Sequence, residues 1–250
     1  MTSFDIKRMD QLQSPVPRPG HRPSPCSACT VRHLTVCAAL DEEELAQMSA
    51  IVTIKELSPG DPLFDEGEPA DHVFNVTAGA IKVYKLLADG RRQMTGFLFP
   101  GDFLGLANEE TYAYSAEAVT HTALCRFPRR KLERLLEEFP KMERRLLGMA
   151  SHELAVAQEQ MLLLGRKTAR EKIASFLLML SRRAEQRGQN GNPVAVPMSR
   201  NDIADYLGLT TETVSRTFTH LKRDGCINLL SGGKVELAGR DRLEGFAEGE

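Results

Sequence analysis

The stretch S-R-N-D-I-A-D-Y-L-G-L-T-T-E-T-V-S-R-T-F-T-H-L-K-R-D-G, from Ser199 to Gly225, has the pattern of two short helices joined by a tight turn. Ser199 can cap the first helix, with Asp202 three residues on. Gly208 permits the turn, and Thr210 can cap the second helix. The apolar residues fall where two crossing helices share a core: Ile203, Ala204, Leu207, Leu209, Val214, Phe218 and Leu221. The stretch therefore predicts a helix-turn-helix, whose second helix enters the major groove of DNA.

The exposed side chains of the second helix suit contacts with bases. Glu212, Ser215 and Arg216 are spaced i, i+3, i+4 and so share one face. Arginine can donate twice to guanine, glutamate can accept from cytosine, and serine can bond either kind of edge. The alternative is an ordinary helical hairpin with a surface Glu–Arg pair. The two caps, the glycine turn and the basic surroundings favour DNA binding.

Charge and hairpin signals extend this module on both sides. Residues 166–225 hold eleven Lys/Arg and six Asp/Glu, a net charge of +5 in a chain whose formal net charge is −2. A basic third on an acidic chain fits a DNA-binding unit joined to a sensor unit, although a solvated helical surface has the same charge. Beyond the second helix, segments 226–230 and 234–237 flank Ser-Gly-Gly and predict the hairpin of a winged helix, whose tip can touch phosphate.

Length and composition exclude several other classes. The chain has 250 residues, 42% of them hydrophobic and 26% charged, as in soluble globular proteins of one or two domains. The leader lacks the apolar segment of a signal peptide, and no apolar run reaches membrane-spanning length, so we expect a cytoplasmic protein with no membrane partner. No glycine-rich phosphate loop, H-E-x-x-H or nucleophile-elbow pattern occurs, so we do not expect an enzyme.

The first half of the chain predicts a β-structure behind a polar leader. Residues 1–25 carry five prolines and little apolar content, and we expect them to be disordered. A short helix is expected over Glu42–Ala50. From Ile51 to Pro128, β-branched and apolar segments alternate with turns, among them Pro-Gly-Asp at 59–61 and at 100–102. This spacing predicts an all-β barrel or roll, and hence an α+β protein.

A long helix follows the roll. From Phe139 onward, apolar residues recur 3-4-3-4-3 along the chain, the a/d rhythm of a coiled-coil seam: Leu147, Ala150, Leu154, Ala157, Met161 and Leu164. A lone amphipathic helix packed on its own domain is the alternative, but the strict period favours a homodimer. The expected organisation is thus a sensor unit at 26–138, a dimerisation helix at 139–165 and a winged helix-turn-helix at 166–250.

Three cysteines and a histidine lie within C-S-A-C-T-V-R-H-L-T-V-C, from Cys26 to Cys37. In a reducing compartment, and with five cysteines in all, metal or redox chemistry is favoured over disulfides. Cys26, Cys29 and Cys37 leave a fourth ligand to be found. Cys125, His33 and Cys226 are the candidates, and Cys226 is better explained as a buried core thiol. The residues leave open an iron–sulfur cluster, a structural Cys3His zinc site and a reversible dithiol switch.

A roll, a dimer helix and a winged helix-turn-helix, in that order, resemble the CRP/FNR family of bacterial transcription regulators over about residues 26–238. The most specific segments are F-L-F-P-G-D-F-L-G (97–105), L-L-L-G-R-K-T-A-R-E-K-I-A-S-F-L (162–177) and D-Y-L-G-L-T-T-E-T-V-S-R (205–216). E-T-V-S-R and the cysteines resemble the FNR branch, the oxygen sensors. That resemblance implies an oxygen-labile [4Fe–4S] cluster on Cys26, Cys29, Cys37 and Cys125.

The resemblance also implies partners. Glu212, Ser215 and Arg216 would read a TTGAT-type inverted repeat, as a two-fold dimer on a palindromic operator. RNA polymerase is a further expected partner, and Arg91 and Arg92 on a predicted roll turn are candidates for meeting it, although a solvated hairpin tip explains them as well.

One segment departs from the cyclic-nucleotide branch. The cassette after P-G-D-F-x-G reads L-A-N-E-E-T-Y-A-Y-S-A (106–116), where that branch has an arginine beside a serine or threonine to bind the cyclic phosphate. Here Tyr114 stands beside Ser115, and no arginine occurs between Arg92 and Arg126. A buried phosphate without a cationic partner is unfavourable, so we do not expect cAMP to bind.

Overall fold

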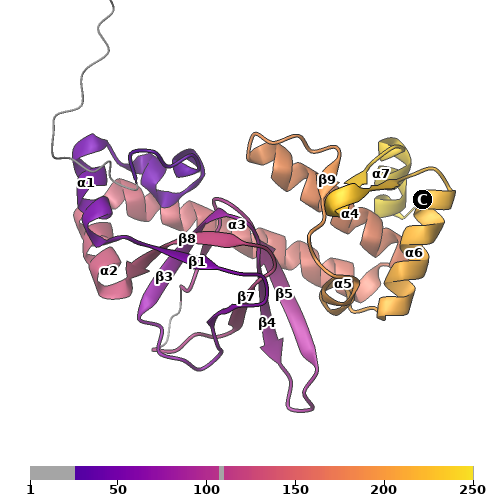
Figure 1. Cartoon of the computed structure of the whole chain (residues 1–250), viewed down its shortest axis with the longest axis horizontal. Coiled ribbons are helices and arrows are strands. Elements are labelled where there is room, and N and C mark those ends of the chain that lie inside the picture. Colours follow the sequence, from indigo (N-terminus) through magenta and orange to yellow (C-terminus); the bar gives the residue numbers. More distant parts are fainter. Residues whose placement is uncertain (1–25, 107–109, 250) are drawn as a thin grey trace, which may run out of the picture.

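The computed structural model describes residues 26–106 and 110–249. The leader over 1–25 and positions 107–109 of the cassette lie outside the described residues. A β-roll with flanking helices forms one end of the molecule, a long helix runs along the roll, and a second helical unit forms the other end (Figure 1). This order confirms the predicted α+β fold.

The segment before the roll is a pair of 3₁₀ turns and a helix. The turns are η1 (Arg32–Leu34) and η2 (Val36–Ala39), and helix α1 covers Glu42–Ile51, close to the predicted range. Asp41 and Glu44 form a reciprocal capping box at the start of α1, which the acidic run after the cysteines supplies.

Two antiparallel sheets make the roll. One has the order β1-β8-β3-β6 and the other β2-β7-β4-β5. Their strands are β1 (Thr53–Leu57), β2 (Pro62–Phe64), β3 (His72–Ala78), β4 (Ile81–Leu86), β5 (Arg92–Leu98), β6 (Phe103–Leu104), β7 (Ser115–Ala118) and β8 (Thr122–Pro128). Both Pro-Gly-Asp segments are corners, because Gly60 and Gly101 have φ of +88° and +101°, a conformation that favours glycine.

Helix α2 (Arg129–Glu138) was not expected and follows β8 directly. Its apolar signal is short, since only Leu132 and Leu135 on its inner face are buried. The long helix α3 spans Pro140–Arg166, in agreement with the predicted 139–165, and begins with proline in its first turn.

The second helical unit, called here the DNA-binding unit, covers residues 169–249. It contains α4 (Ala169–Gln186), β9 (Val194–Ala195), α5 (Arg200–Leu207), α6 (Thr211–Arg223), β10 (Asn228–Leu230), η3 (Ser231–Gly233), β11 (Lys234–Glu236) and α7 (Arg240–Glu248). Strands β10 and β11 pair as the predicted wing. The caps on Ser199 and Thr210 and the left-handed Gly208 are as predicted. Helix α7 was missed, since its one buried residue, Leu243, gives no periodic pattern.

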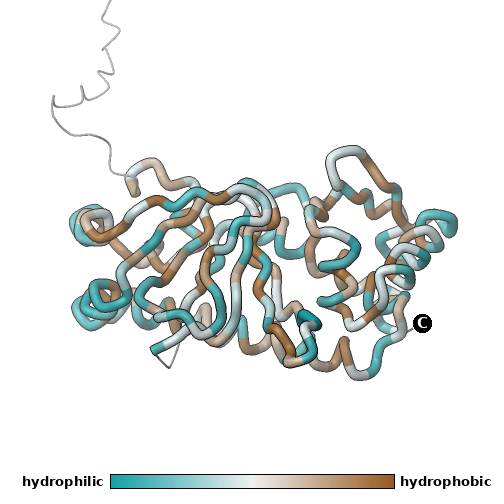
Figure 2. The backbone as a smooth tube through the Cα atoms, turned by 60° about the horizontal axis from the view of Figure 1, so that its bottom comes forward, coloured by the Kyte–Doolittle hydropathy of each residue, from teal (hydrophilic) through white to brown (hydrophobic). Residues whose placement is uncertain are grey.

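Apolar segments run along the strands of the roll and through the interior of the DNA-binding unit, with hydrophilic segments on the outer helices (Figure 2). The core of the DNA-binding unit continues into the roll, because Ala80, Met94, Phe97 and Phe99 belong to it. No helix among the described residues is both long and apolar enough to span a bilayer.

Candidate functional site

The segment that carries the first three cysteines is compact. The residues between Cys29 and Cys37 form η1 and η2, so the long gap is taken up by two 3₁₀ turns. Thr35 caps η2 by accepting from the Cys37 backbone N–H at 3.2 Å. Cys26 is buried, and Cys29 and Cys37 are half-buried. We refer to residues 26–39 as the cysteine segment.

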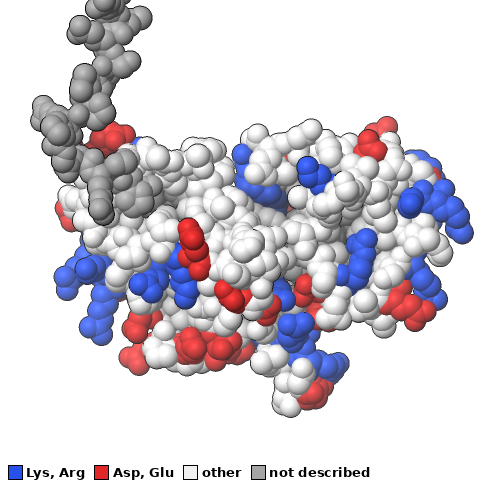
Figure 3. Space-filling model, viewed as in Figure 1, with Lys and Arg blue, Asp and Glu red and all other residues white. Residues whose placement is uncertain are grey.

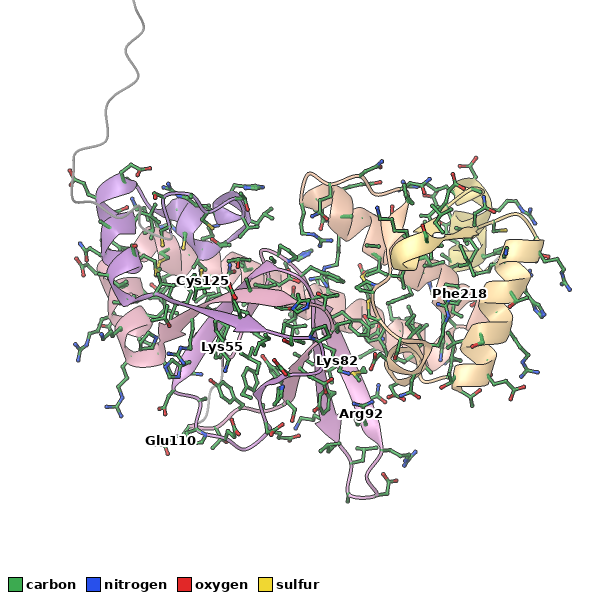
Figure 4. All side chains as sticks on the ribbon, viewed as in Figure 1. Lys55, Lys82, Arg92, Glu110, Cys125 and Phe218 are labelled. Atoms are coloured by element: carbon green, nitrogen blue, oxygen red, sulfur yellow. The ribbon has the colours of Figure 1, made fainter. Side chains whose placement is uncertain are left out.

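Cys125 lies on the roll, directly against this segment. It is half-buried on β8, paired with Ile54 of β1 on one side and Asn75 of β3 on the other. Cys26 belongs to an apolar cluster with residues of α1 and α2, and Cys37 and Cys125 pack against that cluster. Figure 4 shows Cys125 at the end of the roll that lies next to the cysteine segment. The fold thus brings together four cysteines that are up to 99 positions apart in the chain.

The four thiols lie within reach of one another's charge. Burial, together with the charges of Cys29, Cys26 and Cys37, raises the pKa of Cys125 to about 12. Burial also raises the pKa of Cys37 to about 11, against a lowering hydrogen bond with Thr35. The pKa of Cys26 is raised, mainly by burial and in part by Cys29. The Cys26, Cys37 and Cys125 thiols are therefore protonated at neutral pH unless a bound cation replaces their protons.

These residues fit an iron–sulfur cluster by the chemistry of their donors. Four cysteine thiolates are the usual ligand set of a [4Fe–4S] cluster, in which each thiolate binds a different iron. No group of three or more His, Cys, Asp or Glu in the described ranges is already arranged to hold a metal ion.

His33 and Cys226 do not join the group. His33 is exposed on η1, and the charges that act on Cys125 come from the other three thiols. Cys226 is fully buried in the core of the DNA-binding unit, where its Sγ lies 3.8 Å from the Asp224 carbonyl oxygen. Arg32 supplies a positive charge that lowers the thiol pKa of Cys26 and Cys37, and it pairs with Glu42 at 3.0 Å.

The cysteine segment is bonded to α3. Arg145 Nη2 donates to the His33 carbonyl oxygen at 2.8 Å, and Arg145 Nε donates to the Thr35 carbonyl oxygen. One helical turn earlier, Lys141 pairs with Glu44 of α1. Sequence reasoning missed Arg145, because its acceptors are backbone carbonyls that carry no residue-type signal.

The cysteine segment also rests on the second Pro-Gly-Asp corner. A Cβ at Gly101 would lie 2.7 Å from Cβ of Leu34, so only glycine allows this close approach. The next residue, Asp102, pairs with Arg183 of α4 at 2.9 Å. The corner therefore touches the cysteine segment on one side and the DNA-binding unit on the other.

The predicted DNA-contacting residues lie together on the open face of α6. Glu212, Ser215 and Arg216 are all exposed, and Arg216 lies 3.6 Å from Glu212 in a loose pair. Ser215 Oγ donates to the Thr211 carbonyl oxygen of its own helix. Lys and Arg side chains lie at the end of the molecule that carries α6, and others lie at the opposite end and on the roll (Figure 3). At the start of α5, Arg200 lies over the ring of the buried Phe218, with its Cζ 3.5 Å from the ring centre, on the inner side of α6.

The predicted seam residues share an exposed stripe of α3, with one exception. Leu147, Leu154 and Met161 are 66%, 61% and 69% exposed, which is unusual for large apolar side chains. Ala150 and Ala157 are exposed between them, whereas Leu164 is half-buried against the core of the DNA-binding unit. An apolar stripe of this kind is typical of a surface that a partner covers.

Aromatic side chains fill the roll beside the cassette. Phe64 stacks on Tyr112 with ring centres 3.7 Å apart, and Phe74 and Tyr114 lie next to Phe64. Tyr114 Oη accepts from the Gly105 backbone N–H at 3.1 Å. Tyr114 is thus packed into the roll next to Phe64, and the absence of cAMP binding stays a prediction.

Arg91 and Arg92 lie on the hairpin between β4 and β5. Arg91 pairs with Asp89 at 2.7 Å, and Arg92 lies over the Tyr84 ring at 5.6 Å. Neither contact reveals a partner.

Comparison with known proteins gives two family matches along the chain. Residues 54–139 match the cyclic nucleotide-binding domain, and residues 171–246 match the Crp-like helix-turn-helix domain.

Similar proteins share nearly the whole chain. The nitrogen fixation regulation protein FixK of Bradyrhizobium diazoefficiens is 42% identical over 89% of this chain and 93% of its own length. The transcriptional activator protein FnrL of Cereibacter sphaeroides is 43% identical over 82% of this chain and 84% of its own. The solved structure of FixK2 from Bradyrhizobium japonicum is 39% identical, covers 78% of this chain and 97% of that one, and superposes with a TM-score of 0.73.

Proposed function

The chain belongs to the CRP/FNR family of DNA-binding transcription regulators, and from this premise we propose that it is an oxygen-responsive member. In this proposal Cys26, Cys29, Cys37 and Cys125 hold a [4Fe–4S] cluster. Bound there, such a cluster supplies an oxygen-labile centre, whose loss is the signal. The observation that carries the proposal is the convergence of the four thiols, because Cys26, Cys29 and Cys37 of the cysteine segment all act on the pKa of Cys125 on the roll.

The alternatives fit these residues less well. A Cys3His zinc site needs His33 as a ligand, but its side chain is exposed while Cys125 lies against the other thiols. A dithiol switch needs a thiolate at neutral pH, yet burial raises the pKa of Cys37 and Cys125 to about 11 and about 12. The exposed histidine argues against the zinc site, and the raised pKa values of Cys37 and Cys125 argue against the dithiol switch.

The cysteine segment supplies the route from signal to dimer. While its thiolates are held in place, the cysteine segment keeps the hydrogen bonds that it accepts from Arg145 of α3. It also keeps the contact of Leu34 with the Pro-Gly-Asp corner. Release of the thiolates frees the segment and weakens both contacts, which lowers the population of DNA-competent dimer. The dimer forms through the apolar stripe of α3, and its two α6 helices lie one DNA turn apart on an inverted repeat.

In the DNA complex, Glu212, Ser215 and Arg216 read base edges in each half-site of a TTGAT-type repeat. Their exposure on one face of α6 supports this role. RNA polymerase is the partner expected of an activator. The hairpin that carries Arg91 is our candidate for that contact, because Leu86 and Leu87 beside it are 59% and 44% exposed.

Anaerobic purification with iron and sulfide analysis tests the proposal. The wild type should carry about four irons and four sulfides per chain. Cys125→Ala should lose them, while Cys226→Ala, which removes a thiol from the DNA-binding unit, should keep them. Stoichiometric zinc in the wild type, or a full cluster in Cys125→Ala, would refute the four-cysteine site.

A further inference from the structure

The DNA-binding unit rests on the roll of its own chain through an apolar contact. Phe97 of β5 lies 5.1 Å from Tyr206 of α5 and 6.3 Å from Phe176 of α4, measured between ring centres. These three side chains are buried in one continuous core. Apolar burial is non-directional, so it holds the two parts together without selecting one orientation.

Arg183 forms the first of two charged contacts across this interface. Its Nη2 pairs with Asp102 at 2.9 Å, and its Nη1 donates to the Phe97 carbonyl oxygen at 3.1 Å. The same Nη2 lies 3.5 Å from Glu153 of α3. The Arg183 side chain is only 15% exposed. One guanidinium group therefore joins the DNA-binding unit, the roll and the long helix.

Lys82 forms the second charged contact. Its Nζ lies 2.8 Å from Glu117 on the neighbouring strand β7 and 3.3 Å from Asp202 of α5. The side chains of Lys82 and Asp202 are both buried, at 10% and 9% exposure. Figure 4 shows Lys82 on the side of the roll toward the DNA-binding unit. Asp202 also accepts from Ser199, the residue that caps α5. The lysine thus reaches the end of the helix that positions α6.

Buried ion pairs differ from apolar contacts in what they specify. Their desolvation cost offsets much of their attraction, so they add little net stability. Their hydrogen bonds are satisfied in only one arrangement, however, and any rotation of the DNA-binding unit would leave buried charges unpaired. Two such contacts at separate points of an interface fix an orientation that the aromatic core leaves open.

We propose that Arg183 and Lys82 are positioning residues that hold the DNA-binding unit on its own roll in the orientation needed to bind an operator. In this arrangement the proposed base-reading side chains of α6 are exposed, and α6 lies at the end of the molecule away from the roll (Figure 1). A two-fold operator requires two α6 helices at a set separation, so an orientation fixed within each chain lowers the entropy lost on binding. Neither residue lies on α6.

Neutral variants with matched controls test this proposal. Arg183→Met and Lys82→Met keep the apolar stems and remove the charges. Arg182→Met changes the exposed neighbour of Arg183, and Lys85→Met removes an exposed pair with Glu66 from the same strand as Lys82. Binding is measured on a duplex with the TTGAT-type inverted repeat and on a random-sequence duplex, with all proteins in the same anaerobic preparation.

We expect Arg183→Met and Lys82→Met each to lose about tenfold in affinity for the repeat, a typical size for coupling between sites. Affinity for the random duplex should be unchanged, because phosphate contacts do not need the two units at a set separation. Amide exchange in α5 should be faster in both variants than in the controls, with the roll strands unaffected.

Two results would overturn the proposal. The first is that both variants have the same affinity for the repeat and the same amide-exchange rates in α5 as the controls. The other is a rise in affinity for the repeat, which would mean that the contacts hold α6 away from DNA. If Lys82→Met does not fold, Gln93→Ala takes its place, since Gln93 Nε2 donates to the Asp205 carbonyl oxygen of α5 at 3.0 Å. If the wild type carried no iron, the proposed oxygen response would be refuted. The comparison of Arg183→Met and Lys82→Met with their controls would still test the positioning role.

Discussion

Arg145 of α3 donates to the carbonyl oxygen of His33 at 2.8 Å, so the long helix is bonded to the segment between the second and third cysteines. The same guanidinium group also donates to the Thr35 carbonyl oxygen. His33 lies in η1, and Thr35 is the residue that joins η1 to η2. Any change in the cysteine segment therefore reaches the helix whose exposed stripe we assign to the dimer.

Arg145→Gln should loosen the cysteine segment. Glutamine has a shorter side chain and cannot donate to both carbonyls, and hydrogen bonds from a charged donor contribute about 1.5–3 kcal/mol each when well formed. We expect amide exchange over 30–36 in cluster-free protein to become at least about fivefold faster, which corresponds to about 1 kcal/mol. Arg144→Gln, a change at the exposed neighbouring position, is the control, and equal exchange in both variants would contradict the bond's role.

Arg216→Ala should weaken specific DNA binding by about 1–3 kcal/mol and relax base preference at one position of each half-site, since a bidentate base contact is lost. Fluorescence anisotropy on single-base variants of the repeat measures this. Arg223→Ala removes an arginine from the last turn of α6 that pairs with Asp224 at 3.7 Å, and it should leave base preference unchanged. An equal loss of affinity for every sequence would mean that Arg216 contacts phosphate.

Ala157→Asp should dissociate the homodimer. The substitution places two like charges against each other in the seam, and an uncompensated buried charge costs about 3–5 kcal/mol. Ala155→Asp, two positions earlier on the same helix and exposed, should have little effect because it lies off the stripe. Sedimentation at micromolar concentration distinguishes the two variants.

The cluster-free wild type should still sediment as a dimer at micromolar concentration. Every predicted seam position is apolar, so no carboxylate repels its symmetry mate when the cluster is lost. A clean monomer would show that the apolar stripe is insufficient by itself.

Acid should weaken the contact between the roll and the DNA-binding unit through Asp202. Burial would raise the pKa of this carboxyl, but hydrogen bonds with Ser199 and the charge of Lys82 outweigh it and hold the pKa below its ordinary value of 3.8. The contribution of Asp202 to stability is therefore complete above that ordinary value and is lost as the pH falls through the lower folded-state pKa. Two other carboxyl groups lie near Asp202: Glu117 pairs with the same Lys82, and the charge of Asp202 acts on Asp205.

Urea unfolding at several pH values measures that contribution. Asp202→Asn should be less stable than the wild type near neutral pH, and the difference should shrink below about pH 4. Asp205→Asn is a control of opposite sign, because burial raises the pKa of Asp205 and its ionised form is disfavoured in the folded state. A pH-independent difference for Asp202→Asn would mean that its effect comes from packing alone.

Local pattern was sufficient for much of the fold. The caps at Ser199 and Thr210, the turn at Gly208 and the wing strands follow from residue type and spacing, because each depends on neighbours a few positions away. Helix α7 gave no such local signal and was missed. It is held by contacts between residues that are far apart in the chain, such as Phe246 with Arg170, at 4.6 Å. Cys125 was one of three candidates from the residues, and preferring it to His33 needed the family resemblance, because no local signal links it to Cys37 across 88 positions.

The sequence by itself determined the order of the three parts, the residues that share the exposed face of α6 and the apolar period of α3, because helical spacing and capping are local properties. Only the tertiary structure decided which groups meet across those parts. It set Cys125 beside the cysteine segment, joined Arg145 to two backbone carbonyls, and buried Lys82 between Glu117 and Asp202. These contacts depend on how the roll packs against the helices, and packing joins residues that no spacing along the chain connects.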